Sequence, residues 1–382
     1  MKSWSKLFLC ATLLTLLCQF NAAAQEVPKI ISQTLDKGAR AAALTYWTAE
    51  KLQAAIPMDL MHADSASAPA VASAPLEPGS EGATPAQPPS ALGFAGGLGA
   101  FTAATTTPEP TSFVQYYAYP PPYTRSDVPA DTYDETGLYI HYPQSTIGKL
   151  FFTLRGINYV CSASVARPHL LVTARHCVYD GMFATNEVFY PGWHSGPNVS
   201  LSPGSLGGGW PMRTAITWGC SPCGVDAYDI AFIQTFDDDG FGCGGSSFGA
   251  PIEAYTGWLG TSWAGNVGNE PVQHYTEVGY PQGAPFNGNQ MVYSRSSTEV
   301  FDLFGYTDTV GVGSDMTGGS SGGPWIVGWN EGSVTPAGGD YVNGLNSYKF
   351  ISPSRPEEMH GPQFKDYNFN QLRLSAEGLA CP

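Results

Sequence analysis

The sequence has little charge, and most of that charge is of one sign. Charged residues make up 13% of the 382 residues, about half of the roughly 25% usual in soluble domains. Acidic residues number 32 against 17 Lys and Arg, which gives a formal net charge of −15. Binding to nucleic acid requires a basic surface. The composition therefore argues against nucleic acid as a partner.

Long apolar runs are absent beyond the N-terminus. The chain opens with Lys2 and Lys6, an apolar run over residues 7–20 and three alanines at 22–24. This is the layout of a secretory signal peptide over residues 1–24. The run is shorter than the roughly 20 residues that a membrane span needs, so a membrane anchor is the weaker alternative. We expect a protein outside the cytoplasm, either extracellular or periplasmic, and not bound to a membrane.

Basic residues are missing from one long stretch. No Lys or Arg occurs between Lys51 and Arg125, and residues 63–112 consist largely of Ala, Pro, Ser, Thr and Gly. Such a segment buries too little apolar area to offset the entropy lost on ordering. We expect a pro-segment over residues 25–125 that contains this linker. A short helix should end before Pro57, and Arg125 is the expected processing point.

Long helical periodicity is also missing after about residue 138. Short apolar runs there alternate with turns rich in Gly, Pro and Asn, which is typical of strands. The runs are "KLFFTL", "HLLVTA", "DIAFIQ", "STEVFDLF" and "PWIVGW". The 45 glycines, 31 prolines and 13% aromatic residues favour strands and turns over helices. We therefore predict an all-β domain of barrel or sandwich class over residues 126–382.

Two of the eight cysteines lie in the signal peptide, and six remain: Cys161, Cys177, Cys220, Cys223, Cys243 and Cys381. An even number in an exported chain suggests disulfides. Cys161 and Cys177 flank one apolar run and are expected to pair. Cys220 has Cys223 and Cys243 as local partners, and Cys381 takes what is left. The "CSPC" stretch is half of a zinc motif, but no second pair stands at metal spacing, so no metal is expected.

Three polar residues stand where apolar runs begin or end. His176 follows the run "HLLVTA", and Asp229 immediately precedes the run "IAFI". Ser321 lies in "DMTGGSSGGPW", which taken alone could be a flexible linker. A histidine held by a carboxylate can remove the proton of a serine hydroxyl. Asp226 is the alternative carboxylate, although it lies further into the preceding turn.

These segments carry a resemblance to a known family. The order His176, Asp229, Ser321 is that of the chymotrypsin-like class. "TARHC", "YDIAFI" and "SGGP" resemble the histidine, aspartate and nucleophile segments of the trypsin/chymotrypsin superfamily, over roughly residues 145–350. Within it, "TGGSSGGPW", "VGYP" and "NGLNSY" resemble the bacterial glutamyl-endopeptidase-like branch.

The resemblance implies a fold of two six-stranded antiparallel barrels with the active site between them. The first barrel is expected over residues 138–240 and the second over residues 245–375. It also implies a secreted monomeric serine endopeptidase that acts on proteins or peptides without a cofactor. A protease-fold binding or adhesion protein is the alternative from another class, and an esterase would use the same residues.

The resemblance also assigns roles to individual residues. Ser321 is the nucleophile, His176 the general base and acid, and Asp229 the residue that orients His176. The backbone N–H groups of Gly319 and Ser321 form the oxyanion hole. Ser320 precedes the nucleophile where trypsin-like zymogens have an Asp, so the activating N-terminal ion pair cannot form. We therefore expect the pro-segment to cover the cleft or to assist folding.

Substrate preference stays open at this point. Asp315 lies where trypsin-like enzymes have a carboxylate that selects Arg or Lys. Thr317 corresponds to a specificity residue of the glutamyl-endopeptidase-like branch, but Asn346 stands where that branch has a His. The sequence departs from both patterns, and basic, broad and acidic preferences all remain possible.

Overall fold

The computed structural model describes thirteen parts of the chain: residues 28–63, 82–89, 114–116, 123–127, 137–202, 206–219, 226–238, 249–263, 274–296, 300–301, 309–329, 339–351 and 357–379. The expected signal peptide and Cys220, Cys223, Cys243 and Cys381 lie outside these parts. Among the helices that are described, none combines the length and the apolar character needed to cross a membrane.

Six antiparallel strands form a first, closed barrel. In order around the ring they are β7 (Ile147–Leu154), β8 (Ile157–Arg167), β9 (Leu170–Thr173), β12 (Ala231–Thr235), β11 (Trp210–Trp218) and β10 (Thr185–Pro191). The ring closes because β10 pairs with both β7 and β11. Phe151, Val172, Ile216 and Phe232 are fully buried in its core. This is the first of the two predicted barrels.

Six further strands, from two separately paired sheets, make up the second barrel: β14 (Tyr275–Gly279), β15 (Val292–Ser296), β17 (Thr309–Gly313), β21 (Glu358–Pro362), β19 (Tyr341–Leu345) and β18 (Pro324–Val327). Backbone pairing joins β15 to β14, β14 to β18, β18 to β19 and β17 to β21, always antiparallel. Ser294 Oγ bridges β15 and β17 by donating to Gly313 O. At the last junction Gly361 lies so close to Leu345 that a Cβ would be 1.9 Å from its carbonyl oxygen. The fold is therefore the expected two-barrel, trypsin-like one.

Local sequence explains individual elements. The tight β7–β8 hairpin turns at Arg155 and Gly156, which both have positive φ, 50° and 80°, as two-residue hairpins of this hand require. Strand β7 contains all of "KLFFTL", and β9, β12 and β18 contain most of "HLLVTA", "DIAFIQ" and "PWIVGW", respectively. Of "STEVFDLF", only Val300–Phe301 is described, as strand β16.

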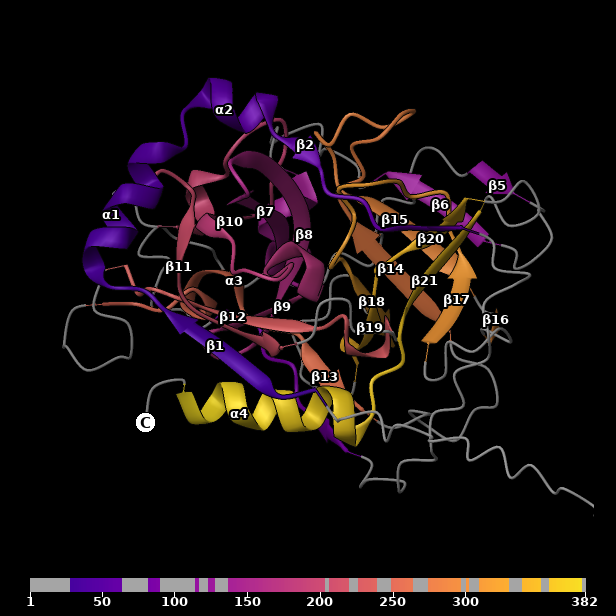
Figure 1. The fold of residues 1–382 in the computed structure, drawn as a ribbon. Helices are drawn as coiled ribbons and strands as arrows, with labels where there is room; N and C mark the ends of the chain where they lie inside the picture. Colours follow the sequence, from indigo (N-terminus) through magenta and orange to yellow (C-terminus); the bar gives the residue numbers. More distant parts are fainter. Residues whose placement is uncertain are drawn as a thin grey trace, which may run out of the picture.

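The N-terminal segment is folded onto the first barrel (Figure 1). Strand β1 (Ile30–Thr34) pairs antiparallel with β11, and helices α1 (Lys37–Tyr46) and α2 (Ala49–Ala54) follow it. Asp36 and Thr48 cap the two helices by accepting backbone N–H groups. Trp47 between them is buried, and its Nε1 donates to Asn186 O at 2.6 Å. The predicted short helix is thus two helices, both of which end before Pro57.

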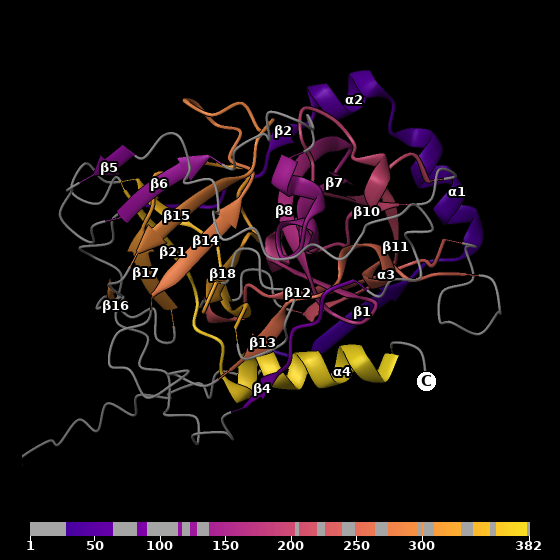
Figure 2. The same ribbon diagram turned by 180° about the vertical axis from the view of Figure 1, so that it is seen from behind.

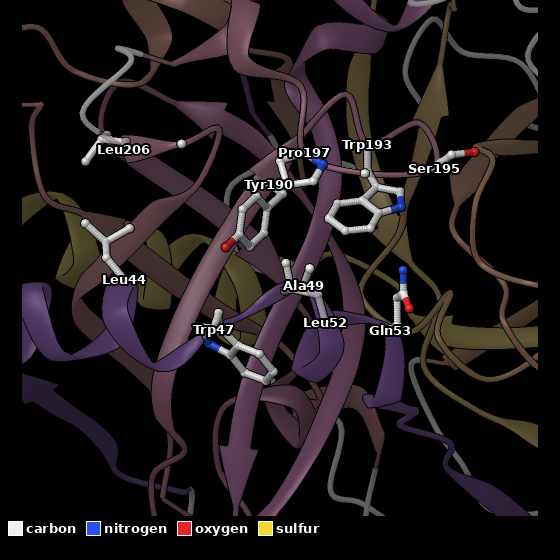
Figure 3. A pocket seen from close by; sticks show the side chains of 12 residues that line it. Leu44, Trp47, Ala49, Leu52, Gln53, Tyr190, Trp193, Ser195, Pro197 and Leu206 are labelled. Carbon is white, nitrogen blue, oxygen red and sulfur yellow. The ribbon is translucent and has the colours of Figure 1, made fainter.

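A groove of about 510 Å³ runs along the seam between these helices and the barrel (Figure 3). Leu44, Trp47 and Leu52 line it from the N-terminal segment, and Tyr190 and Trp193 line it from the barrel. Aromatic side chains from the two sides of this seam pack the N-terminal segment against the barrel. Trp47 packs against Phe151 with tilted rings whose centroids are 5.5 Å apart.

The remaining elements extend the two barrels (Figure 2). They are β2 (Ile56–Pro57), β3 (Met61–Ala63), β4 (Ala83–Thr84), β5 (Val114–Tyr116), β6 (Tyr123–Asp127), α3 (Glu253–Thr256), β13 (Gly260–Ser262), β20 (Lys349–Ile351) and α4 (Gln371–Leu379). Arg125, the expected processing point, lies in the middle of β6, which pairs along its whole length with β15. Proteolysis requires such a strand to open locally.

Candidate active site

His176 and Asp229 meet at the ends of two neighbouring strands. His176 lies in the 3-10 turn after β9, and Asp229 lies two residues before the start of β12. These strands pair with Thr173 opposite Ala231, which brings their ends together. His176 Nδ1 is 2.8 Å from Asp229 Oδ2, and the His176 backbone N–H donates to Asp229 Oδ1 at 2.9 Å. Both side chains are buried.

The surroundings keep Asp229 charged. Burial alone would raise the pKa of its carboxyl, but the charges of His176 and Arg175 and the hydrogen bonds from His176 and Ser347 lower it well below the usual value. An ionised carboxylate on Nδ1 leaves Nε2 as the ring nitrogen that can accept a proton. Of the two candidate carboxylates, Asp229 contacts the histidine. The carbonyl of Asp226 accepts the Asp229 N–H in the preceding turn.

Ser347 is a site residue that sequence reasoning missed. Its Oγ donates to Asp229 Oδ2 from the opposite barrel. This is the same carboxylate oxygen that contacts His176 Nδ1, so the hydrogen bond helps to hold the carboxylate that orients the ring. The stretch "NGLNSY" was recognised in the sequence, but nothing in it indicates that the serine faces a residue 118 positions away.

Ser321 lies in a tight turn in which two neighbouring positions, Gly319 and Gly322, require glycine. Gly319 and Gly322 have φ of +95° and +80°, a region that other residues rarely adopt. A Cβ on Gly322 would lie 2.1 Å from Thr173 Oγ1, on the strand that leads to His176. Ser162 on β8 donates its backbone N–H to Ser321 O at 2.8 Å. The serine loop of the second barrel is therefore fastened directly to the first.

The two adjacent serines point to different partners. Ser320 Oγ donates to Thr317 O at 2.8 Å and so stays within the turn. Ser321 Oγ donates at 3.4 Å to the carbonyl oxygen of Met58, in the N-terminal segment. The Gly319 N–H donates to the same oxygen at 3.1 Å. A peptide carbonyl thus accepts from one of the two predicted oxyanion donors, the Gly319 N–H, and the segment that supplies it was not foreseen.

The three candidate specificity residues do not line an open pocket together. Asp315 Oδ2 accepts from Arg125 at 2.6 Å, and both side chains are mostly buried. Asn346 is fully buried, and its Oδ1 accepts from Trp325 Nε1 at 2.6 Å. Thr317 Oγ1 donates to Gly283 O. Each side chain is thus engaged inside the protein.

Lys349 is a second residue that sequence reasoning missed. Its Nζ donates to Ser314 O at 3.0 Å and to Met316 O at 3.1 Å, on the two sides of Asp315. Burial lowers the pKa of this ammonium, while neighbouring carboxyl groups, Glu277 and Asp315 first among them, act to raise it. The region expected to select the substrate side chain therefore contains the Lys349 ammonium beside the Asp315 carboxylate.

Cys161 and Cys177 form the predicted disulfide next to His176. The bond joins β8 to the turn that carries the histidine. Because both sulfurs are part of the disulfide, neither can bind a metal ion as a thiolate, although both lie close to a ring nitrogen of His176. The disulfide therefore belongs to the scaffold of the site.

Removing this disulfide should destabilise the first barrel. The bond closes a loop with a sequence separation of 16, for which lost chain entropy corresponds to about 3 kcal/mol. We expect the Cys161→Ala/Cys177→Ala variant to lower the free energy of unfolding by about that amount, measured by denaturant titration. An unchanged midpoint would show that the bond does not constrain the unfolded chain.

Comparisons with known proteins give structural likeness only. No family profile and no curated sequence matches the chain. A thermostable serine protease, AL20, from an extremophilic microorganism is 27% identical with a TM-score of 0.48, over 61% of this chain and 98% of its own. The protease Anisep from Arthrobacter nicotinovorans is 29% identical with a TM-score of 0.45, over 58% and 91%. A Glu endopeptidase is 17% identical with a TM-score of 0.46, over 66% and 96%.

The strand pairing described above identifies the architecture. The chain has the two-barrel, trypsin-like fold. In this fold, the His176–Asp229 pair stands on the first barrel and the Ser321 loop on the second.

Proposed function

We propose that this protein is a secreted serine endopeptidase with His176, Asp229 and Ser321 as its catalytic triad. The observation that carries the proposal is that two groups of the site donate hydrogen bonds to the same atom. The Ser321 hydroxyl and the Gly319 N–H converge on one peptide carbonyl oxygen, that of Met58. In acyl transfer the oxyanion donor binds the carbonyl oxygen and the nucleophile attacks the carbonyl carbon, so both groups must lie next to one carbonyl group.

The proposed mechanism proceeds through an acyl-enzyme. In the structure Ser321 Oγ bonds to Met58 O, and no hydrogen bond within the described residues joins it to His176 Nε2. Ser321 Oγ attacks the carbonyl carbon while His176 Nε2 takes its proton. Asp229 holds the ring through Nδ1 and stabilises the imidazolium. The N–H groups of Gly319 and Ser321 stabilise the negative oxygen. His176 then gives its proton to the departing amine, and water hydrolyses the acyl-enzyme.

Labelling with a serine-directed fluorophosphonate tests this proposal. We expect prolonged incubation to place the label on Ser321, located by peptide mass, and the Ser321→Ala variant to remain unlabelled. A non-catalytic binding protein on the same fold would take up no label. An esterase would be labelled equally, but would leave peptide substrates intact.

We further propose that the protease does not select basic residues. A carboxylate selects Arg or Lys only if its charge is available, and that of Asp315 is paired with Arg125. Lys349 adds a second positive charge beside it. An incoming basic side chain would be repelled rather than neutralised.

Matched peptides with Arg, Ala or Glu on the acyl side of the scissile bond test this proposal. We expect the kcat/KM for the Arg peptide not to exceed that for the Ala peptide, and Arg125→Met to raise the Arg-to-Ala ratio by freeing Asp315. The Asp315→Ser variant serves as the control, because it removes the carboxylate as well. A strong Arg preference in the wild type that Asp315→Ser abolishes would contradict the proposal.

A further inference from the structure

The segment of residues 55–63, called the strap below, lies along the candidate active site. Strand β2 of the strap pairs with β8, with Ile56 opposite Tyr159 and Pro57 opposite Val160. The Met58 N–H continues this ladder by donating to Val160 O at 3.0 Å. Gln282 Nε2 holds the start of the strap by donating to Ala55 O at 2.7 Å.

Beyond Met58 the strap follows the second barrel. The backbone N–H of Lys349 donates to Leu60 O at 3.2 Å, and β3 then pairs with β20. Figure 1 shows this N-terminal chain passing from β2 to the side of β20. Asp59 lies against the backbone of Gly318, next to the oxyanion loop. The strap therefore bridges both barrels, with the Met58 carbonyl at the nucleophile.

The two sides of the site bind different halves of a substrate. His176 must protonate the departing amine, so the leaving half of a substrate belongs on its side. That side carries the Cys161–Cys177 disulfide and the neighbouring Val160 of β8. The acyl half belongs along the specificity loop, and β20 lies there because Lys349 Nζ contacts both Ser314 O and Met316 O.

The strap runs through the site in the direction opposite to that of a substrate. Residues before the Met58 carbonyl lie on the β8 side, and residues after it lie on the β20 side. The strap is parallel to β8 at its start and parallel to β20 at its end. It therefore keeps a single direction through the cleft. The nitrogen bonded to the Met58 carbonyl carbon is that of Asp59, and it lies toward the specificity loop rather than toward the leaving side.

We propose that the strap is a built-in inhibitor that occupies the active site in reverse direction and is therefore not cleaved there. This inference rests on the proposed function. If Ser321 Oγ attacked the Met58 carbonyl carbon, its proton would pass to His176. The Asp59 nitrogen could not receive that proton, so the adduct would only return to the free serine and the intact peptide bond.

The state of the catalytic groups agrees with a blocked site. Ser321 Oγ bonds to the strap, and His176 Nε2 is buried without a hydrogen-bond partner among the described residues. The strap is also anchored at a distance, since Trp47 and the two N-terminal helices are packed on the first barrel. Activation then requires release of the strap by a cut elsewhere in the chain.

The test uses the full chain and measures the rate of fluorophosphonate labelling at Ser321. Met58→Pro removes the N–H that bonds to Val160, and should speed labelling by about tenfold or more. Asp59→Lys replaces the carboxylate whose charge interacts with those of His176 and Lys349 by a cation, which should repel the strap from the site and so speed labelling. Ile56→Ala is the matched control, because its side chain is 47% exposed and its backbone bonds stay. Thermal unfolding of each variant checks that it is folded.

Intact mass of the incubated wild-type chain tests the direction. We expect the Met58–Asp59 bond to survive in dilute solution. A fragment beginning at Asp59 that forms in the wild type but not in Ser321→Ala would overturn the reversed direction. Equal labelling rates in the wild type, Met58→Pro and Asp59→Lys would overturn the inhibition while leaving the proposed function standing. Folded variants that never take up label would remove the proposed function, and this inference with it.

Discussion

The Ser321→Ala variant is expected to lose about 10⁶-fold in kcat, because the covalent route disappears with the hydroxyl. The fold should persist, since within the described residues Ser321 Oγ makes only one long hydrogen bond, to Met58 O. Hydrolysis of a fluorogenic peptide measures the loss, with both proteins freed of the strap in the same way. The circular dichroism spectrum should not change.

Ser320→Ala is the matched control for this variant. Its hydroxyl donates to Thr317 O within the turn and does not reach the Met58 carbonyl. We expect kcat to change by less than about tenfold, the effect of one local hydrogen bond. If Ser320→Ala were the inactive variant instead, the nucleophile would be assigned to the wrong serine.

The Asp229→Asn variant is expected to lose about 10⁴-fold in kcat near neutral pH. An amide at this position can donate to Nδ1, which favours the tautomer with its proton on Nε2. His176 then cannot accept the serine proton. Asp226→Asn is the control, because it keeps the carbonyl that accepts the Asp229 N–H. Peptide hydrolysis across pH measures both variants, and wild-type activity in Asp229→Asn would refute the role of Asp229.

Local patterns were sufficient for the barrels and for the contact between His176 and Asp229, while the catalytic role of Ser321 with these two residues stays a prediction. His176, Asp229 and the glycines around Ser321 stand beside apolar strands, and a strand fixes where the residue at its end lies. The disulfide could be expected for the same reason, because its cysteines flank one strand. The structure brings together His176 and Asp229 as predicted, and distinguishes Asp229 from Asp226.

The contacts that the sequence could not give are those between distant segments. Arg125 and Asp315 are 190 positions apart, and their ion pair removes the carboxylate on which a basic preference depends. Nothing in the composition of the strap distinguishes it from an ordinary loop, because it binds mainly through backbone groups. Backbone donors and acceptors are the same at every non-proline residue, so no sequence pattern reports such binding.

Trapping the acyl-enzyme tests the central claim most directly. The strap-released protein is mixed with a peptide substrate, quenched in acid within its first turnovers and analysed by mass. The account predicts a protein species heavier by the acyl fragment, with the added mass on the peptide that contains Ser321. Peptide cleavage without any such adduct, undiminished in the Ser321→Ala variant, would contradict it.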